Sequence, residues 1–301
     1  MDEGNGQMHM MIFGAGYSGK AIGALAASRG ITVTGTTRSA EKAQALEKRG
    51  IRPALFDGET LSEALLETLL TVTHLVQSIA PGASGDPLIR LLGPAGLRKV
   101  MPQLQWVSYL STVGVYGDHD GAWVDEETAI NPVSQRSLER VEAEAAWQSL
   151  SAQEDLPLAI LRLSGIYGPG RNTFVNFDKG TARRLVKKDQ VFNRIRVEDI
   201  ATATVFLAEP RLGGIFNVTD DEPCPPQDVV TEAARLLGVE PPPEQPFETA
   251  ELTPMARSFY GENKRVSNAK IKALGFAFRF PEYRASLQDL WDMRTRKITA
   301  Q

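Results

Sequence analysis

The chain has 301 residues, 42% of them hydrophobic and 23% charged, a balance typical of a folded globular protein of one or two domains. Its formal net charge of −4 argues against a nucleic-acid-binding surface, and no apolar run approaches the ~20 residues that span a bilayer. One cysteine and three scattered histidines exclude a Cys/His zinc site, and the acidic, Gly-rich start of the chain does not resemble a secretory signal. We therefore expect a soluble cytoplasmic protein with no metal, nucleic-acid or membrane partner.

Short β-like runs alternate with helical patterns over the first part of the chain. The predicted strands are residues 8–13, 31–34, 51–56, 72–77, 106–110 and 158–163. A first helix follows the first strand, and later helices are predicted at residues 39–49, 61–70, 87–99 and 134–150. This alternation indicates βαβ units, with helices on both faces of a parallel sheet.

Three of these helices have features that the structure can test. The first helix has Ile22, Leu25 and Ala26 on one face, and Ser39 is a candidate N-cap for the second. The long helix is expected to bury its apolar residues, which are Leu138, Val141, Ala145 and Trp147.

The later part of the chain has shorter elements and more proline. A polar stretch covers residues 117–132, and beyond Gly168 we predict helices near residues 199–208 and 227–237 and a strand at 215–218. The expected organisation is a nucleotide-binding domain at residues 8–168, whose core also receives parts of 190–220. A smaller, partly interleaved α/β substrate-binding region would cover residues 169–301.

A glycine-rich turn follows the first predicted strand and opens the first helix. Its sequence, Gly14-Ala-Gly16-Tyr17-Ser18-Gly19, matches the G-x-G-x-x-G pattern. Gly14 permits the tight turn, Gly16 lets the backbone approach a pyrophosphate, and Gly19 lets the helix pack on the strand. In this context the pattern predicts a dinucleotide site in a Rossmann-type, doubly wound α/β fold.

The same residues come close to a P-loop, with Lys20 directly after Gly19. Ala21, however, stands where a P-loop needs Ser or Thr to hold Mg²⁺. The sequence therefore argues against a kinase or ATPase.

The end of the second strand indicates which dinucleotide binds. An NAD site usually carries Asp or Glu about 20 residues after the glycine turn, but here the sequence is Thr36-Thr37-Arg38. Two hydroxyls and a guanidinium suit a 2′-phosphate, so NADP is favoured over NAD. If Arg38 is only a solvated surface residue, the preference stays open.

Two further motifs point to a family. The segments Leu110-Ser-Thr-Val-Gly-Val-Tyr-Gly117 and Leu161-Arg-Leu-Ser-Gly-Ile-Tyr-Gly-Pro169, with the glycine turn, resemble the extended and atypical branches of the short-chain dehydrogenase/reductase superfamily. This is the NAD(P)-dependent epimerase/dehydratase group. The resemblance implies a Rossmann core with a small C-terminal substrate domain. It also implies cofactor contacts from Asp57 and from the loop Ser78-Ile79-Ala80.

The family's chemistry uses a Ser or Thr, a Tyr and a Lys, and only the first is present here. Thr112 stands at the Ser/Thr position. Glu144 matches the acidic residue four after the family's Lys, which places Arg136 at the Tyr position and Arg140 at the Lys position. An arginine does not cycle a proton near neutral pH. Arg140 can still hold a ribose hydroxyl, whereas Arg136 cannot replace a phenol.

Other residues are weaker candidates for the site. A literal Tyr-x-x-x-Lys runs from Tyr260 to Lys264, and with Phe259 these residues are pocket walls or ordinary packing residues. Asp199 and His119 are acid/base candidates, with a first-turn helix carboxylate and a solvated loop histidine as the alternatives. The substrate-site candidates are Tyr116, Tyr167, Arg171 and Tyr260, for which packing or surface pairing is the alternative.

Two functions remain open from the sequence. The first is an NADP-binding, epimerase/dehydratase-like oxidoreductase acting on a small polar, sugar-like substrate, with hydride transfer at nicotinamide C4 and Thr112 polarising the reacting oxygen. The second is a non-catalytic NADP(H)-binding sensor or scaffold that kept the cofactor site and lost the Tyr and Lys. The resemblance also implies a homodimer formed through the long helix at residues 134–150 and the helix at 87–99.

Overall fold

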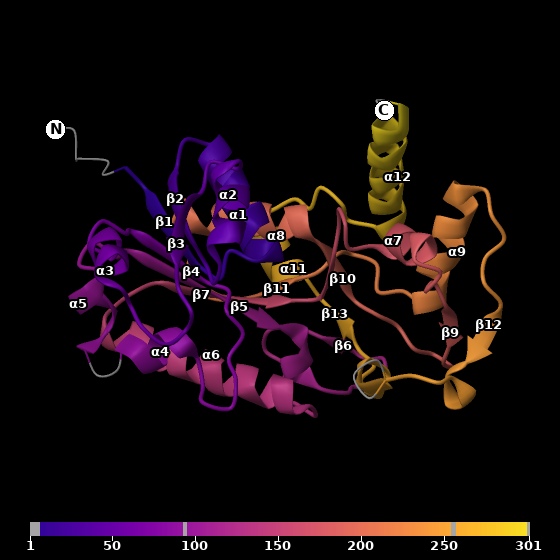
Figure 1. Cartoon of the computed structure of the whole chain (residues 1–301). Coiled ribbons are helices and arrows are strands. Elements are labelled where there is room, and N and C mark those ends of the chain that lie inside the picture. Colours follow the sequence, from indigo (N-terminus) through magenta and orange to yellow (C-terminus); the bar gives the residue numbers. More distant parts are fainter. Residues whose placement is uncertain (1–6, 93–94, 254–256, 300–301) are drawn as a thin grey trace. The chain divides into compact units, whose positions relative to one another are not determined.

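A computed structural model describes residues 7–92, 95–253 and 257–299 (Figure 1). The chain forms two compact units. Unit 1 comprises Met1–Thr112, Gln135–Arg162 and Ile200–Phe216, and unit 2 comprises Val113–Ser134, Leu163–Asp199 and Asn217–Gln301. Residues 113–134 lie inside the range 8–168 proposed for the first domain, yet they pack with unit 2. They do so because the short strand β6 (Trp123–Val124) pairs with β13 (Arg265–Val266) of that unit.

A seven-stranded sheet forms the centre of unit 1, in the order β11-β7-β5-β4-β1-β2-β3. Its strands are β1 (His9–Phe13), β2 (Thr32–Thr37), β3 (Arg52–Leu55), β4 (His74–Gln77), β5 (Trp106–Thr112), β7 (Leu158–Leu163) and β11 (Gly214–Val218). β1 pairs in parallel with both β2 and β4, so the strand order reverses beside β1. This confirms the predicted doubly wound Rossmann-type fold, in which ligands bind beyond the carboxyl ends of the strands at that reversal.

Helices cover both faces of this sheet (Figure 1). They are α1 (Tyr17–Ser28), α2 (Ala40–Glu47), α3 (Glu63–Leu69), α4 (Pro87–Leu92), α5 (Leu97–Val100), α6 (Gln135–Gln153) and α8 (Val197–Ala208). On one face, Gly23 of α1 lies so close to Ile12 and Ile51 that a Cβ there would collide with them. Ser39 caps α2 as predicted, because its hydroxyl accepts a hydrogen bond from the Lys42 N–H at 3.4 Å.

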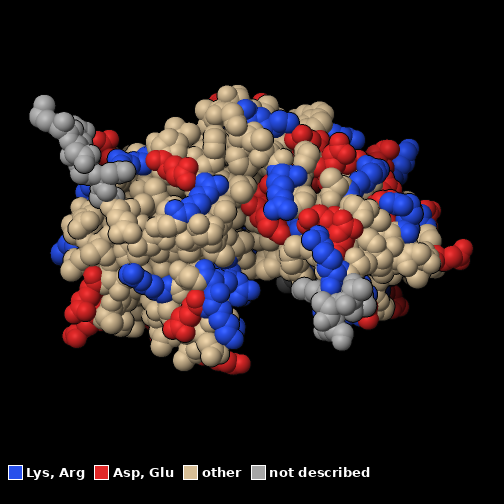
Figure 2. Space-filling model, turned by 90° about the horizontal axis from the view of Figure 1, so that it is seen from above, with Lys and Arg blue, Asp and Glu red and all other residues tan. Residues whose placement is uncertain are grey.

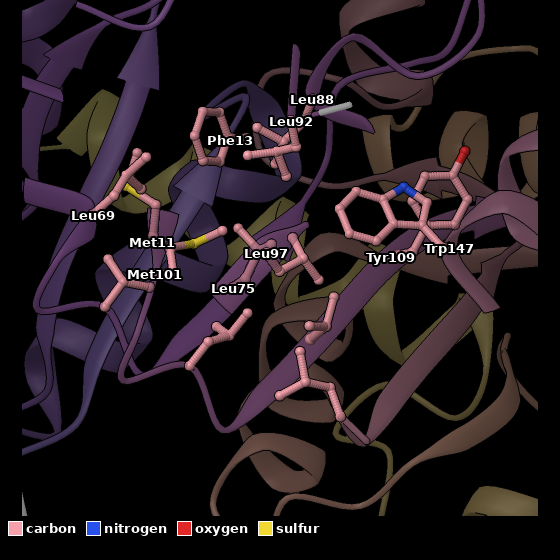
Figure 3. Close-up of a cluster of buried hydrophobic side chains, with 14 of the residues drawn as sticks. Met11, Phe13, Leu69, Leu75, Leu88, Leu92, Leu97, Met101, Tyr109 and Trp147 are labelled. Carbon is pink, nitrogen blue, oxygen red and sulfur yellow. The ribbon is translucent and has the colours of Figure 1, made fainter. Parts of the chain in front are cut away.

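The opposite face carries the main apolar cluster. Side chains of α3, α4, α5 and α6 pack there against alternate residues of the strands, and Figure 3 shows Tyr109 of β5 beside Trp147 of α6. Their rings are stacked, with centroids 6.3 Å apart. Burial of each such large side chain stabilises the fold by about 1.5–3 kcal/mol. This cluster fixes α6 along the sheet below β5.

Two details of these helices differ from the prediction. The single helix expected at residues 87–99 is two helices, because Gly96 has a φ of +81° and the Glu154 carboxylate accepts the N–H groups of Leu97 and Arg98 to start α5. The expected apolar face of α6 is also wrong in part. Trp147 is buried, but Leu138 and Ala145 are exposed. The buried position beside Trp147 is taken by the charged Glu144, which has partners in the sheet.

The described residues of unit 2 form three pairs of strands and several helices. The pairs are β6 with β13, β8 (Gly165–Tyr167) with β10 (Arg194–Arg196), and β9 (Arg184–Val186) with β12 (Glu244–Pro246). The helices include α7 (Thr173–Asp178), the predicted α9 (Pro226–Leu237), α11 (Ala269–Ala273) and α12 (Tyr283–Thr299). No helix was expected from the sequence where α12 lies. Part of its buried face is polar, since Ser286 and Asp289 bind the buried Arg196 guanidinium.

No helix within the described ranges is long and apolar enough to cross a membrane. On the face seen in Figure 2, acidic and basic side chains are interspersed with uncharged ones.

Candidate functional site

The glycine turn between β1 and α1 needs glycine at two positions for the fold itself. Gly14 has a φ of +87°, and its N–H donates to the Thr36 hydroxyl at 2.8 Å. A Cβ on Gly14 would lie 2.8 Å from a side-chain carbon of Ile79, and one on Gly19 would lie 2.6 Å from the Gly14 carbonyl oxygen. The turn is therefore packed against the loop after β4 on one side and against its own helix on the other.

Gly16 is different, because no atom of the described residues crowds a Cβ placed there. It is exposed, and the nearest atom to such a Cβ is the Gly14 carbonyl oxygen, 3.9 Å away. Gly16 is also the N-cap of α1, and within the described residues no side chain forms a cap hydrogen bond at this helix start. A helix N-terminus with this close backbone approach fits the pyrophosphate of a dinucleotide.

The end of β2 differs in one respect from what the sequence suggests. Thr36 is buried and its hydroxyl is held by the Gly14 N–H, so it serves the turn and does not face a ligand. Thr37 is half-buried and accepts the Ser39 N–H at 3.5 Å. Arg38 is exposed. Thr37 and Arg38 are therefore the residues of this segment that a bound group can reach.

The ends of β3 and β4 bring the remaining cofactor candidates to the same edge of the sheet. Asp57 is exposed, and hydrogen bonds from the backbone N–H groups of Glu59 and Thr60 lower the pKa of its carboxyl. The Ser78 N–H donates to the Phe13 carbonyl, which ties the loop after β4 to the end of β1. Ile79 packs over Gly14, as described above. Ala80 is exposed.

A buried carboxylate that the sequence analysis missed holds this loop. Asp86 accepts hydrogen bonds from the Gln77 amide (2.8 Å), the Leu88 N–H (2.9 Å) and the Trp147 indole N–H (3.1 Å). The Gln77 oxygen in turn accepts the Ile79 N–H at 3.4 Å. Asp86 thus caps α4 and connects the loop after β4 to α6. Its sequence signal was an Asp before a Pro at a helix start.

The end of β5 and the start of α6 carry the candidates for chemistry. Thr112 is the last residue of β5 and is half-buried. Arg140 donates from Nη1 to the Leu110 carbonyl at 2.6 Å and to the Tyr109 hydroxyl at 3.3 Å. Burial raises the pKa of Tyr109 to about 12. Arg136, one turn earlier on α6, is exposed. The structure therefore ties Arg140, and not Arg136, to the end of β5.

Glu144, one turn further along α6, is buried between two strands. Its carboxylate accepts the Ser111 hydroxyl of β5 at 2.5 Å and pairs with the Arg162 guanidinium of β7 at 2.8 Å. All three side chains are at most 5% exposed. The sequence analysis used Glu144 only to align α6 and did not assign a role to Ser111 or Arg162.

Comparison with known families fits this geometry. The model of the NAD dependent epimerase/dehydratase family matches residues 10–219, which include the glycine turn, β5 and α6. The chain belongs to this family. The resemblance drawn from the motifs is thereby confirmed.

Two relatives cover almost the whole chain. Protein YeeZ of Escherichia coli is 29% identical over 286 residues, which are 90% of this chain and 96% of YeeZ. The structure of a functionally unknown conserved protein from Silicibacter pomeroyi superposes with a TM-score of 0.86 at 44% identity, covering 95% of this chain and 99% of that one. Neither name states an activity.

Two more distant structures share the fold and contain a dinucleotide. A human epimerase family protein with NADPH has a TM-score of 0.70 at 17% identity, covering 95% of this chain and 99% of that one. A dTDP-glucose 4,6-dehydratase from Bacillus anthracis in complex with NAD has a TM-score of 0.75 at 18% identity, covering 96% of this chain and 97% of that one. The fold thus accommodates either nicotinamide dinucleotide.

In this epimerase/dehydratase chain, three of the weaker candidates have clear packing partners within unit 2. The Tyr116 hydroxyl is buried and donates to the Asn217 side chain at 2.7 Å. Tyr260 packs against Phe192 and Phe247, and burial raises the pKa of its phenol. Lys264 is buried and donates to the Gly117 carbonyl at 2.6 Å. The Tyr-x-x-x-Lys of residues 260–264 is therefore built into the packing of unit 2.

The other candidates of unit 2 are spread over it. The Tyr167 hydroxyl is buried beside Ser286, and burial raises the pKa of this phenol. Arg171 is exposed in the turn after β8. The buried Asp199 carboxylate accepts the N–H groups of Arg279 and Phe280 at 2.8 and 2.9 Å, a structural role. His119 lies with its Nε2 3.1 Å from the Tyr116 carbonyl oxygen.

One acidic residue of unit 2, to which the sequence assigned no role, is poorly supplied with hydrogen bonds. Asp220 is 1% exposed, and neither carboxyl oxygen has a well-formed hydrogen bond within the described residues, although the nearby Glu222 N–H and Arg194 guanidinium act to lower its pKa. Burial raises the pKa of this carboxyl well above its usual range. The same ranges contain no group of three or more His, Cys, Asp or Glu side chains arranged to hold a metal ion.

Proposed function

We propose that the protein is an NADP(H)-binding, epimerase/dehydratase-like oxidoreductase that acts on a small polar, sugar-like substrate. The observation that carries this proposal is the glycine turn, where Gly16 is exposed, uncrowded and placed at the uncapped start of α1. A glycine that the packing does not require, at a helix N-terminus without a side-chain cap hydrogen bond, is expected where a pyrophosphate binds.

NADP is favoured over NAD at the end of β2. The segment that would meet the adenosine ribose contains no carboxylate, and Arg38 is exposed there beside the half-buried Thr37. A guanidinium forms charge-assisted hydrogen bonds with a phosphate, whereas the Asp or Glu of an NAD site would repel it. Asp57, Ser78, Ile79 and Ala80 would line the same dinucleotide on the neighbouring strands.

When bound, the nicotinamide supplies or accepts a hydride at C4. The protein's own contribution would come from two residues at the end of β5 and the start of α6. Thr112 would donate a hydrogen bond to the reacting oxygen of the substrate. Arg140, held by the Leu110 carbonyl, would use its remaining N–H groups to hold the nicotinamide ribose.

A second function is favoured by a specific observation in the same region. Arg136 and Arg140 stand where the family has its Tyr and Lys, and an arginine is too basic to give up a proton near neutral pH. A chain that binds NADP(H) without a proton donor would be a non-catalytic sensor or scaffold. Both functions share the cofactor site, so the proposal is tested first on binding and then on turnover.

The binding test compares three proteins by calorimetric titration with NADPH and NADH. We expect Gly16→Ala to lose both cofactors, because its Cβ meets no crowding atom among the described residues but blocks the pyrophosphate. Its unfolding temperature should fall modestly, since the ψ of −144° at Gly16 lies outside the β region that residues with a Cβ prefer. Arg38→Ala should bind NADPH roughly tenfold to hundredfold more weakly, with little change for NADH. Equal weakening of both cofactors by Arg38→Ala would rule out its contact with the 2′-phosphate.

The turnover test begins with a screen of NADPH oxidation against carbonyl compounds and sugars. On a confirmed substrate, Thr112→Val should lower the rate about 10²–10³-fold and leave NADPH affinity nearly unchanged. A fully active Thr112→Val would place the reaction centre elsewhere. The double variant Arg136→Tyr, Arg140→Lys is put through the same screen. If the wild type has no substrate in it and the double variant oxidises NADPH weakly, the sensor is favoured.

The same family resemblance leads us to propose a homodimer formed through α6 and α4. Leu138, in the first turn of α6, is 42% exposed, and a second copy packed on α6 would cover it. Light scattering should give twice the mass of one chain, and Leu138→Glu should reduce it to one.

A further inference from the structure

Two polar side chains of α6, one helical turn apart, bind β5; the contacts of Arg140 are called the first step and those of Glu144 the second step. Arg140 and Glu144 are four residues apart, so they lie on the same side of α6. Arg140 binds the Tyr109 hydroxyl and the Leu110 carbonyl, and Glu144 binds the Ser111 hydroxyl. Tyr109 and Ser111 are two residues apart on β5, so their side chains point to the same face of the sheet, which is the face covered by α6. Arg140 thus contacts β5 at Tyr109 and Leu110, and Glu144 contacts it further along, at Ser111.

The second step also reaches the neighbouring strand. Arg162 of β7 donates to both oxygens of the Glu144 carboxylate, from Nε at 3.2 Å and from Nη2 at 2.8 Å. The carboxylate is therefore held by β5 and β7 at once. A slide of α6 by one residue, about 1.5 Å along its axis, would break the contacts of both steps.

This arrangement costs stability that an apolar contact would not. Removing two charges from water is expensive, and a buried ion pair is often no more stable than well-packed hydrophobic side chains of the same volume. What such a pair provides is a single geometry, since both partners must meet in one register. The register of α6 on β5 sets the distance between Arg140, on the helix, and Thr112, at the end of the strand. The proposed function places both residues at the nicotinamide half of the cofactor.

We propose that Glu144 is a positioning residue for this half of the site. Held by Ser111 and Arg162, it fixes the register of α6 on β5 and so the place of Arg140 relative to Thr112. The proposal rests on the proposed function, because it assigns the purpose of the contact to the nicotinamide ribose. It adds Glu144, Ser111 and Arg162 to the residues on which cofactor binding depends, although none of them would touch the cofactor.

The test separates the two halves of the cofactor. NADPH occupies both halves of the site, whereas 2′,5′-ADP contains only the adenosine and its 2′-phosphate. We expect Ser111→Ala to raise the Kd for NADPH about tenfold and to leave the Kd for 2′,5′-ADP within about twofold. Glu144→Gln keeps the shape of the side chain and removes its charge. It should raise the ratio of the Kd for NADPH to the Kd for 2′,5′-ADP at least as far as Ser111→Ala does. Both are measured by titration calorimetry, with unfolding monitored in parallel.

Glu154→Gln is the matched control. The Glu154 carboxylate also belongs to unit 1 and accepts two backbone N–H groups, at Leu97 and Arg98, but it lies beyond the other end of α6. Its variant should be less stable and should keep the wild-type ratio of the two Kd values. A purely structural role for Glu144 would make Glu144→Gln behave like Glu154→Gln.

The outcomes distinguish this proposal from the proposed function. If the wild type binds both ligands and the ratio stays unchanged in Ser111→Ala and Glu144→Gln, the positioning role is wrong and the NADP(H) site stands. If the wild type binds neither ligand, the proposed function falls and the positioning role falls with it. A tenfold selective loss of NADPH affinity in both variants, absent in Glu154→Gln, supports both.

Discussion

The two units treat their buried polar groups differently. In unit 1, the carboxylates of Glu144 and Asp86 each accept several hydrogen bonds, and within its described residues the buried side-chain atoms left without a partner are the hydroxyls of Ser108 and Ser151. In unit 2, Asp199 is held by two backbone N–H groups, but both carboxyl oxygens of Asp220 lack a well-formed hydrogen bond among the described residues. The buried oxygens left without a partner there also include those of Glu222 and Gln227.

This difference indicates where each unit's geometry is determined. A carboxylate that is held on every side fixes the elements around it, and in unit 1 those elements are the ones that carry the cofactor candidates. A buried carboxyl without donors is expected to be neutral or to be satisfied by water or a ligand. The candidate cofactor site of unit 1 is thus organised by contacts within the protein, whereas the carboxyl of Asp220, after β11 in unit 2, needs a further donor or a proton.

The largest effect should come from breaking the paired carboxylate of unit 1. Arg162→Met leaves Glu144 buried and without its counter-ion, so we expect the free energy of unfolding to fall by about 3–5 kcal/mol. Chemical denaturation measures it. The double variant Arg162→Met, Glu144→Met should recover most of the loss, because it removes both charges. A single variant as stable as the wild type would mean that the pair is not buried in solution.

The next effect concerns acid pH and the buried histidine of unit 1. His74 lies between the Thr73 hydroxyl and the Ala208 carbonyl, and burial lowers the pKa of its imidazole to about 4. Because the folded pKa is below the unfolded value of 6.5, the neutral ring contributes stability above pH 6.5 that is lost as pH falls toward 4. The loss should approach roughly 3 kcal/mol.

Denaturation at a series of pH values compares the wild type with His74→Gln to measure this effect. The wild type should lose more stability than the variant between pH 6.5 and 4. Parallel curves for the two proteins would show that the imidazole is accessible to water.

Asp220 should respond in the opposite direction. Because burial raises the pKa of its carboxyl in the folded protein, the stability of the protonated form is present below the unfolded pKa and is lost as pH rises through the folded value. Asp220→Asn should therefore match the wild type at acid pH and exceed it at pH 7, by on the order of 1–3 kcal/mol. A variant that is less stable at pH 7 would reveal a donor on the carboxylate, and the contrast with Glu144 would fail.

The sequence predicted the parts of the molecule that follow local rules. The sheet and its helices come from the alternation of short apolar runs, and the glycine turn comes from the steric limits on Gly14 and Gly19. The role of Thr36 could not be predicted, because its bond to Gly14 joins two segments that only the folded sheet brings together. The same holds for the partners of Glu144, which lie on two different strands. The apolar pattern predicted that Leu138 is buried, because such a pattern counts only apolar residues as core residues. It cannot show that a charged residue such as Glu144 is buried when its ion-pair partner is buried with it.

The smallest effect tests a polar group of unit 2 that does have a partner. The Tyr116 hydroxyl donates to the Asn217 side chain, whose own N–H binds the Ser267 carbonyl. Tyr116→Phe removes one neutral hydrogen bond and keeps the ring, so the free energy of unfolding should fall by about 1 kcal/mol at every pH. Because the hydroxyl is already paired within unit 2, NADPH affinity and any turnover found by the screen should be unchanged. A loss of turnover with normal stability would instead make Tyr116 the missing proton donor. The Tyr116 hydroxyl of unit 2 would then take part in the chemistry although it is hydrogen-bonded within that unit. The candidates for the chemistry would no longer be confined to unit 1.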